Sequence, residues 1–578
     1  MRALISAAML MAVATTTNGT AQVQPAPTAP APAPTAPAPA APANPAPATP
    51  APIVPAPPKL IIAISVDQFS ADLFSEYRHA FTGGLARLAG GAVFPQAYQA
   101  HGATETCPGH STILTGSHPG RTGIIANNWF DQRLNRADKK VYCAENPTVD
   151  GTSSDSGQYV QSTHFLRVPT LGDRMVAFNP QSQIISVAGK DRAAIMMGGR
   201  HAADLWWLAP TGLASFAGVQ QSSTVARIST AIAAALGQAR APLDLPAQCA
   251  PRDAAVPIAD GRTVGTGRFG RAAGNFRGMM ASPESDGMVL AAAATLRAAH
   301  HMGEGAQTDL LIIGLSATDY VGHTYGTEGS EMCLQILSLD QQLGDFLARM
   351  DATGVDYAVV LTADHGGHDL PERNQTNAAP AAARVDAALS PDAMGERLKG
   401  ELGITVDGPL FYADAPFGDF YVSRALPAAQ RARVVTAAIA AYSANPQVER
   451  VVRASTLAAM PMPRRSPELW TIEERLRASF DAERSGDFVV VLKPRITPIA
   501  SAGSGYVATH GSVWDYDRRV PMLFWRAGMR GFEQPNPVMT VDILPTIAGL
   551  IHLPIASGQI DGRCLDLMAG DGTTCPAP

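Results

Sequence analysis

The sequence is poor in charged residues and has no long apolar run. Charged types make up 16% of the 578 residues, acidic residues outnumber basic ones by 50 to 44, and the formal net charge is −6. Because the chain has no basic run, we expect no nucleic-acid partner. No stretch beyond the N-terminal region reaches the roughly 18 uninterrupted apolar residues of a membrane-spanning helix, so we predict no integral membrane segment in the mature chain.

Cysteine is also scarce, and none of the six cysteines has the paired spacing of a zinc finger. An even number of cysteines in an exported chain indicates disulfide bonds, whose connectivity sequence alone does not determine. Cys564 and Cys575 are the best candidate pair, since they lie close together near one chain end. The remaining pairs would then be Cys107 with Cys143 and Cys249 with Cys333.

The N-terminal region predicts export. Residues 1–22 have a positive start at Arg2, a short apolar stretch and small residues after it, which is typical of a secretory signal. No cysteine follows the apolar stretch, which argues against a lipoprotein. Residues 23–58 are almost entirely proline and alanine, a composition that predicts an extended, disordered spacer. We therefore expect a periplasmic or secreted protein.

Three apolar runs rich in branched residues predict strands that are buried on both faces, at 60–66, 309–315 and 357–363. Asp67 and Asp364 directly follow two of these strands, and Asp319 lies shortly after the third. Ligand sites in open α/β sheets lie beyond the carboxyl ends of the strands. Asp67 alone could equally cap the next helix. Together the runs predict an α/β fold with a mostly parallel central sheet flanked by helices.

Histidines accompany two of these aspartates. His323 follows Asp319 at the i+4 position, which places both side chains on one face of a helical turn. His365 directly follows Asp364, and the two glycines after it permit a sharp turn. Aspartate and neutral histidine suit zinc. With His510, which alone would more often have another role, the chain has enough ligands for two metal ions.

The run from Ala103 to Ser111 reads as a loop that becomes a helix. Pro108 suits a first helical position, because its missing N–H would have no partner there. Thr106 would then lie at the helix N-terminus, where free N–H groups and the helix dipole favour an anion. Its hydroxyl is a candidate nucleophile for phosphate if metal ions lower its pKa. A purely structural threonine at an N-cap is the commoner alternative.

Three further polar residues suit phosphate. Asn127 could donate a hydrogen bond to an oxyanion, and its alternative is a turn residue. A strand predicted over 182–188 leads to Lys190 and Arg192. If the chain stays extended there, residues two apart share a face, so both cations would point at one pair of phosphate oxygens. Two solvated surface cations are the commoner case for this pattern.

Seven motifs, in this order along the chain, resemble those of the alkaline phosphatase superfamily: Ser65-Val66-Asp67, Thr106-x-Pro108-Gly109-His110, Asn127-Asn128-Trp129, Lys190-x-Arg192, Asp319-x-x-x-His323, Asp364-His365-Gly366 and His510-Gly511. The chain is most similar to the PafA-type bacterial alkaline phosphatases, which are related to the nucleotide pyrophosphatase/phosphodiesterases. The resemblance makes 59–578 an alkaline phosphatase-like catalytic domain, with insertions at about 200–285 and 369–500.

The resemblance also implies roles for these residues. One zinc ion would be bound by Asp319, His323 and His510. A second would be bound by Asp67, Asp364 and His365, with the Thr106 oxygen as a further ligand. Asn127, Lys190 and Arg192 would contact the phosphoryl group.

These roles predict an exported two-zinc phosphomonoesterase that acts as a monomer on small phosphate esters, through a phospho-threonine on Thr106. Two cations aimed at the terminal phosphate oxygens favour a monoester over a diester. A phosphodiesterase or nucleotide pyrophosphatase of the same fold is the alternative, and an inactive binding protein is another.

Sulfatases of the superfamily have a proline two residues after a modified cysteine and then an arginine. Here Pro108 directly follows Cys107, and no arginine is in place. Export argues against the related phosphoglycerate mutases and phosphopentomutases.

Overall fold

The computed structural model describes residues 56–149, 159–502, 505–570 and 572–576. The predicted signal sequence and nearly all of the predicted spacer lie outside these residues. Among the described helices, none is both long and apolar enough to cross a bilayer.

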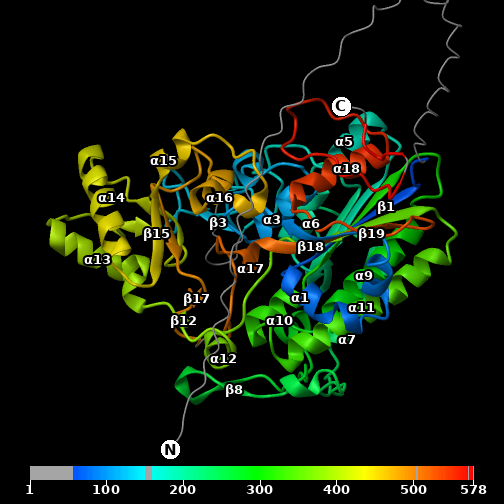
Figure 1. Ribbon diagram of the computed structural model, residues 1–578, viewed down its shortest axis with the longest axis horizontal. Helices are drawn as coiled ribbons and strands as arrows, with labels where there is room; N and C mark the ends of the chain where they lie inside the picture. The colour runs from blue at the N-terminus through cyan, green and yellow to red at the C-terminus, as the bar shows by residue number, and fades with distance from the viewer. Residues whose placement is uncertain (1–55, 150–158, 503–504, 571, 577–578) are drawn as a thin grey trace, which may run out of the picture. The chain divides into compact units, whose positions relative to one another are not determined.

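A mostly parallel sheet forms the centre of the fold, as the sequence predicts (Figure 1). Its parallel strands lie in the order β11-β1-β10-β5-β6, and β18 and β2 continue it with antiparallel pairing beside β11. The bounds are β1 Leu60–Val66, β2 Ala92–Tyr98, β5 Ile184–Ala188, β6 Asp204–Ala209, β7 Gly212–Ala214, β10 Asp309–Leu315, β11 Tyr357–Thr362 and β18 Arg519–Arg526. The central strands are apolar on both sides because both faces are covered.

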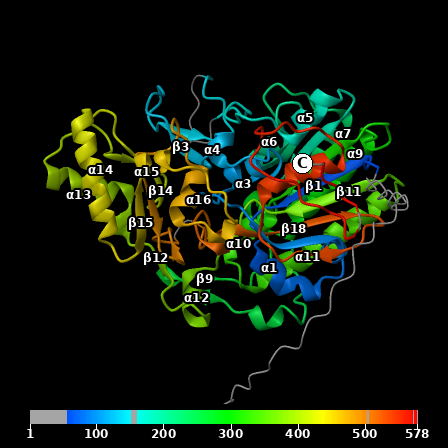
Figure 2. The ribbon, with the colours of Figure 1, turned by 45° about the horizontal axis from the view of Figure 1, so that its top comes forward.

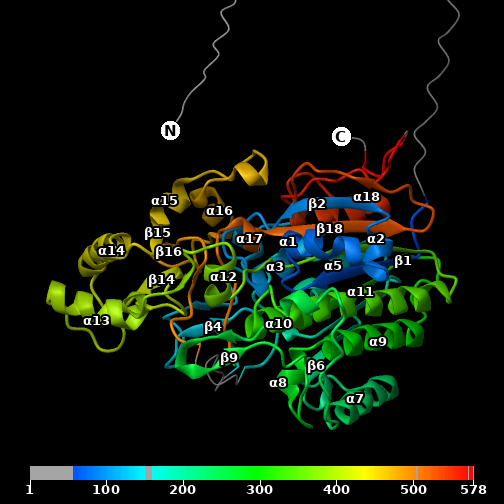
Figure 3. The same cartoon turned by 60° about the horizontal axis from the view of Figure 1, so that its bottom comes forward.

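Helices cover both faces of this sheet. On one face α9 packs on β5 and β10, and α11 packs on α9 and α2; Figure 3 shows α9 and α11 side by side. On the other face α6 packs on β5 and β10, and α3 packs on α6. The bounds are α2 Gly84–Leu88, α3 Thr106–Ile113, α6 Asp191–Gly198, α7 Ser223–Leu236, α9 Pro283–Ala299, α10 Ala317–Tyr325, α11 Ser330–Asp351 and α18 Ile543–Leu550. Because β11, β1 and β10 are neighbouring parallel strands, their carboxyl ends lie side by side at one edge of the sheet.

The segment 369–500, which we call the cap region, contains an antiparallel sheet of its own in the order β13-β14-β16-β15. Helices α13 and α14 lie beside this sheet (Figures 1 and 2). Phe420, Tyr442 and Phe488 form the centre of a separate apolar cluster there. The bounds are β13 Phe411–Tyr412, β14 Gly418–Val422, β15 Val448–Arg453, β16 Phe488–Leu492, α13 Pro391–Leu402 and α14 Ala428–Ser443. The segment 369–500 therefore has an apolar core of its own.

The segment 200–285 corrects that interpretation in part. We expected an insertion beside the main sheet, but β6 pairs in parallel with β5, and β7 pairs with β6, so both strands extend the central sheet. These two strands have only six and three residues, too few for a clear sequence pattern. The three disulfide bonds are Cys107–Cys143, Cys249–Cys333 and Cys564–Cys575, as the sequence predicted.

Candidate active site

Three buried carboxylates meet where three neighbouring strands end. Asp67 follows β1, Asp364 follows β11, and Asp319 lies in the first turn of α10, directly after β10. Each carboxylate is at most 2% exposed. After Asp67 the chain turns through Gln68, whose φ of 63° is in the left-handed region, and the N–H of Gln68 donates a hydrogen bond to Asp364 Oδ1 (3.1 Å). This strained turn ties two of the three strand ends together.

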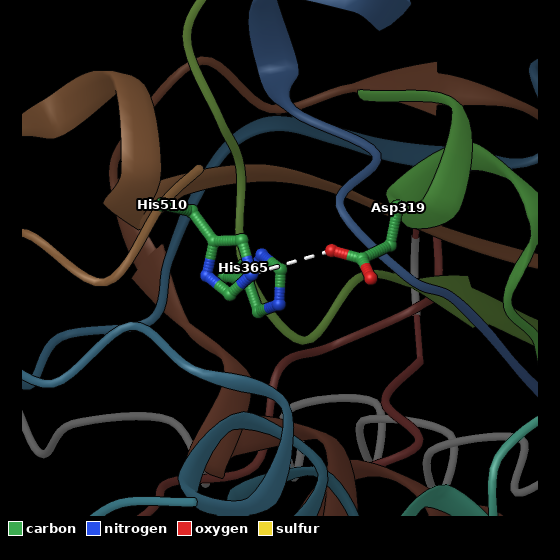
Figure 4. Close-up of side chains that lie close together, drawn as sticks. All are labelled: Asp319, His365 and His510. Carbon is green, nitrogen blue, oxygen red and sulfur yellow. Dashed lines mark ion pairs between the residues drawn. The ribbon is translucent and has the colours of Figure 1, made fainter. Parts of the chain in front are cut away.

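The three predicted histidines surround these carboxylates. His323 Nε2 and His510 Nε2 lie 3.3 and 3.2 Å from Asp319 Oδ1. His365 Nε2 lies 3.3 Å from Asp364 Oδ2 and 3.4 Å from Asp67 Oδ1. The rings of His365 and His510 stack with a centroid distance of 3.6 Å, and Asp319 faces them in Figure 4.

Each of these imidazoles is oriented by a backbone carbonyl. The Nδ1 atoms of His323, His365 and His510 lie 2.8–2.9 Å from the carbonyl oxygens of Ala508, Gly366 and Thr104, respectively. A carbonyl only accepts hydrogen bonds, so each Nδ1 carries a proton and each Nε2 atom faces the carboxylates. Metal-binding histidines are typically held in this way.

The ligand atoms form two groups, and within each group all atoms lie within 4.8 Å of one another. One group is Asp67, Asp364 and His365, the three residues that the family resemblance assigns to a single ion. The other is Asp319, His365 and His510, so His365 belongs to both groups. Among the described residues His323 belongs to no such group, although it contacts Asp319; it is held farther away by its bond to Ala508.

The chemistry of this cluster fits divalent cations. Buried atoms that make no hydrogen bond include Asp67 Oδ1, Asp319 Oδ1, Asp364 Oδ2 and His365 Nε2. Burial, reinforced by the Asp364 carboxylate, raises the pKa of Asp67 well above its usual value. Burial lowers the pKa of His365 to about 3, which keeps that imidazole neutral. Crowded carboxylates beside neutral imidazoles are the donor set that zinc binds.

Lys190 is the cation nearest these carboxylates. Its Nζ lies 2.5 Å from both Asp67 Oδ2 and Asp319 Oδ2, and the side chain is buried. Although burial opposes protonation, Asp319 and Asp67 outweigh it and raise the pKa of Lys190 above its usual value. Lys190 therefore lies between the two ligand groups and forms an ion pair with one carboxylate of each, Asp67 and Asp319.

Arg192 and Thr106 come together at the same place. Arg192 Nη2 lies 3.5 Å from Thr106 Oγ1. We expected an extended chain to align Lys190 with Arg192, but Lys190 is the N-cap of α6 and Arg192 lies in its first turn, so a helix start brings both cations to the site. Thr106 is the first residue of α3 and Pro108 the third, two positions later than we expected. Proline fits there too, because N–H groups in a first turn have no helical partner.

Asn127 is fixed beside Thr106. Its Oδ1 accepts a hydrogen bond from the N–H of Cys107 (2.8 Å), and its own N–H donates to Glu105 Oε2 (2.6 Å). With Oδ1 engaged, the side-chain NH₂ is the group that can donate to a phosphoryl oxygen. All of the predicted site residues therefore lie in one cluster.

The sequence analysis assigned no role to Glu105 and His110, although both lie in the Thr106 run. Glu105 holds Asn127, as described above. His110 Nδ1 lies 2.8 Å from the Thr106 carbonyl oxygen and 3.1 Å from Asp364 Oδ2, so it links α3 to a predicted metal ligand. Their position at i−1 and i+4 from Thr106 was the available signal.

A close approach of backbones holds α3 in place. A Cβ atom added to Gly109 would lie 2.0 Å from the carbonyl oxygen of Asp364. We expect Gly109→Ala to lower the free energy of unfolding by about 3 kcal/mol, because a rigid backbone atom must move. Urea unfolding of the purified variant measures this change.

Gly400 provides the matched control, because it is also helical but has no neighbour within 4 Å of an added Cβ. Gly400→Ala should leave stability unchanged or raise it by up to about 1 kcal/mol. Equal stability of the two variants would show that α3 does not depend on this contact.

A cavity of about 110 Å³ opens between the site and the cap region. Glu105 and His510 line it on the site side, and Phe130, Phe417 and Tyr421 are among its aromatic residues. Phe417 packs closely on Gly511, next to His510. The cap region thus forms one wall beside a predicted metal ligand.

Comparison with known proteins gives consistent matches. The sequence model of the family described as type I phosphodiesterase / nucleotide pyrophosphatase matches residues 61–513. Alkaline phosphatase PhoK of Sphingomonas sp. is 56% identical over 521 residues, covering 90% of this chain and 92% of PhoK. Alkaline phosphatase PhoD of Zymomonas mobilis is 50% identical, with 90% and 89% covered. The crystal structure of wild-type alkaline phosphatase PafA has a TM-score of 0.76 at 25% identity, covering 90% of this chain and all of PafA.

Proposed function

The chain belongs to the type I phosphodiesterase / nucleotide pyrophosphatase family and is an alkaline phosphatase, and we propose that it forms a phospho-threonine on Thr106. The sequence predictions of family, fold class and enzyme class are therefore confirmed. The proposal adds the nucleophile, the phosphate contacts, the metal ions and the location.

The observation that carries the assignment is the half-buried guanidinium of Arg192 beside the buried hydroxyl of Thr106. Arg192 contacts Thr106 Oγ1, its Nε makes no hydrogen bond, and it forms no ion pair among the described residues. A half-buried arginine without a carboxylate partner is an incomplete arrangement, which two oxygens of a phosphoryl group would complete by accepting two hydrogen bonds from the planar guanidinium.

Asp67, Asp364 and His365 would hold one zinc ion, with Thr106 Oγ1 as a further ligand of that ion. Asp319, His323 and His510 would hold the other. Bound zinc supplies Lewis acidity, which lowers the pKa of a hydroxyl and offsets the charge on attacking and leaving oxygens. The unpaired carboxylate oxygens and the three oriented Nε2 atoms support this assignment.

The residues of the chain then perform a double displacement. Thr106 Oγ1 loses its proton and attacks phosphorus, the P–O bond to the alcohol breaks, and the departing oxygen takes up a proton, so that the alcohol leaves. Asn127 and Arg192 hold the non-bridging oxygens where charge is concentrated. Water then breaks the P–O bond to Thr106, which releases inorganic phosphate and restores the hydroxyl.

The location and assembly are part of the proposal. We infer export from residues 1–22 and a monomer that acts on small phosphate esters. Residues 59–578 would be the catalytic domain. The cavity beside His510 would hold the alcohol portion of the phosphate ester.

Arg192→Ala tests the phosphate contact. We expect kcat/KM for an aryl phosphate monoester to fall by about 100-fold, because one preorganised charged donor is lost, whereas the diester of the same alcohol should lose much less. Rates measured on zinc-loaded enzyme for both esters give the ratio directly. Lys190→Ala should also lower the monoester rate, but its contacts with Asp67 and Asp319 mean that zinc content must be measured alongside.

Phosphodiesterase activity remains the alternative function, and the name of the matching family favours it. The same two-substrate comparison separates the two. A wild-type enzyme that prefers the diester, with a ratio unaffected by Arg192→Ala, would overturn the monoesterase assignment.

A further inference from the structure

A closed ring of covalent and hydrogen bonds surrounds the phosphate site. Cys107, which follows Thr106, is joined by a disulfide to Cys143. Tyr142 precedes Cys143, and its hydroxyl donates a hydrogen bond to Asp191 Oδ1 (2.7 Å). Asp191 lies between the two predicted phosphate contacts Lys190 and Arg192, and Arg192 returns to Thr106 Oγ1.

Asn127 is held at the centre of this ring by both cysteines. The N–H of Cys107 donates to Asn127 Oδ1 (2.8 Å), and the N–H of Cys143 donates to the Asn127 carbonyl oxygen (3.0 Å). The disulfide therefore restrains the distance between the N–H groups of Cys107 and Cys143, which both hold Asn127 in place.

Asp191 connects the ring to the arginine. Its Oδ1 accepts both the Tyr142 hydroxyl and the N–H of Arg192 (2.7 Å). Asp191 is the first residue of α6, so this carboxylate fixes where the helix starts. The start of α6 in turn sets where the Arg192 guanidinium lies. Tyr142 and Cys143 are buried, whereas Asp191 and Arg192 are half-buried.

We propose that Tyr142 is a positioning residue for Arg192, acting through Asp191, and that the Cys107–Cys143 disulfide holds Tyr142 in register with Thr106. Tyr142 touches no reacting atom. This inference rests on the proposed function, because it assigns to the ring the alignment of the phosphoryl contacts with the nucleophile. Preference for a monoester over a diester should therefore depend on residues that do not touch substrate.

Tyr142→Phe tests the proposal, since it removes one hydroxyl and keeps the ring. We expect kcat/KM for the monoester to fall about 10-fold with little change for the diester, as a misplaced donor loses part of its effect. Binding of inorganic phosphate, measured by calorimetry, should weaken in parallel. Asp191→Asn keeps the Oδ1 acceptor and should retain the preference, whereas Asp191→Ala should lower it.

Tyr357→Phe is the matched control, because it also removes a tyrosine hydroxyl that donates to an aspartate, Asp351 (2.8 Å), but far along the sheet from the site. Stability should change in this variant and the monoester-to-diester ratio should not. For the disulfide, Cys107→Ser with Cys143→Ser should lower the ratio, whereas Cys564→Ser with Cys575→Ser should not.

The outcomes separate the two proposals. If wild-type enzyme prefers monoesters and Arg192→Ala abolishes the preference, but Tyr142→Phe and the Cys107/Cys143 double variant retain it, the ring has no positioning role. If wild-type enzyme shows no preference, the function proposed for Arg192 fails first. If Tyr142→Phe does not fold, the pair Asp191→Asn and Asp191→Ala decides: equal ratios would overturn the proposal.

Discussion

Thr106→Ala should abolish turnover. The hydroxyl of Thr106 is the only group of the site that we assign as a nucleophile, and both displacement steps use it. We expect kcat to fall by at least about 10³-fold, as when other enzymes lose a nucleophile while their remaining machinery stays intact. Steady-state hydrolysis of an aryl phosphate monoester measures the loss. Zinc content should stay close to that of wild type, because the assigned aspartates and histidines remain.

Thr106→Ser is the matched control, since it keeps a hydroxyl at the first position of α3 and should retain much of the activity. Acid quenching with radiolabelled monoester should trap a phosphoprotein in wild type and in the serine variant, and none in the alanine variant. Turnover by Thr106→Ala at the wild-type rate would show that water attacks the substrate directly. It would leave Thr106 with the structural role of a helix N-terminal residue.

The strands were predictable because burial on both faces leaves a strong pattern. β1 and β10 begin and end where the apolar runs do, and an aspartate at or shortly after a strand end was enough to place the site. The i, i+4 spacing of Asp319 and His323 was equally direct, because α10 is a helix. These are local features, and the sequence carries them within a few residues.

Long-range contacts were not predictable from single motifs. Nothing in the sequence near His365 indicates that it borders both ligand groups, since that depends on how β11 packs beside β1. We expected an extended chain at Lys190 and Arg192, but the aspartate between them starts a helix. Lys190 then contacts two carboxylates, whereas Arg192 contacts Thr106. Tyr142 is 49 residues from Asp191, and only the folded chain brings them together.

His365→Ala should reduce both zinc content and turnover. His365 Nε2 lies between Asp67 and Asp364, and its ring stacks on His510 of the other group. Removing this imidazole takes a ligand from one predicted ion and leaves a space beside a ligand of the other. We expect the loss of about one zinc equivalent after dialysis and a fall in kcat/KM of about 10³-fold, because metal-assisted displacement needs both ions. Metal analysis and hydrolysis assays on the same sample measure both effects.

His368→Ala is the control, because it also removes a buried histidine from the same loop. His368 contacts Thr497 Oγ1 (3.3 Å) and belongs to neither ligand group in the described part of the chain. It should keep two zinc equivalents even if its stability falls. The low pKa of His365, about 3, adds a second expectation, because protonation of this imidazole competes with zinc only in strong acid. Although burial opposes protonation, Asp319 raises the pKa of His510 above its usual value, so the ion assigned to His510 should be lost first as pH falls from 8 to 6. Full zinc content in His365→Ala would mean that this histidine orients His510 by stacking and binds no metal itself.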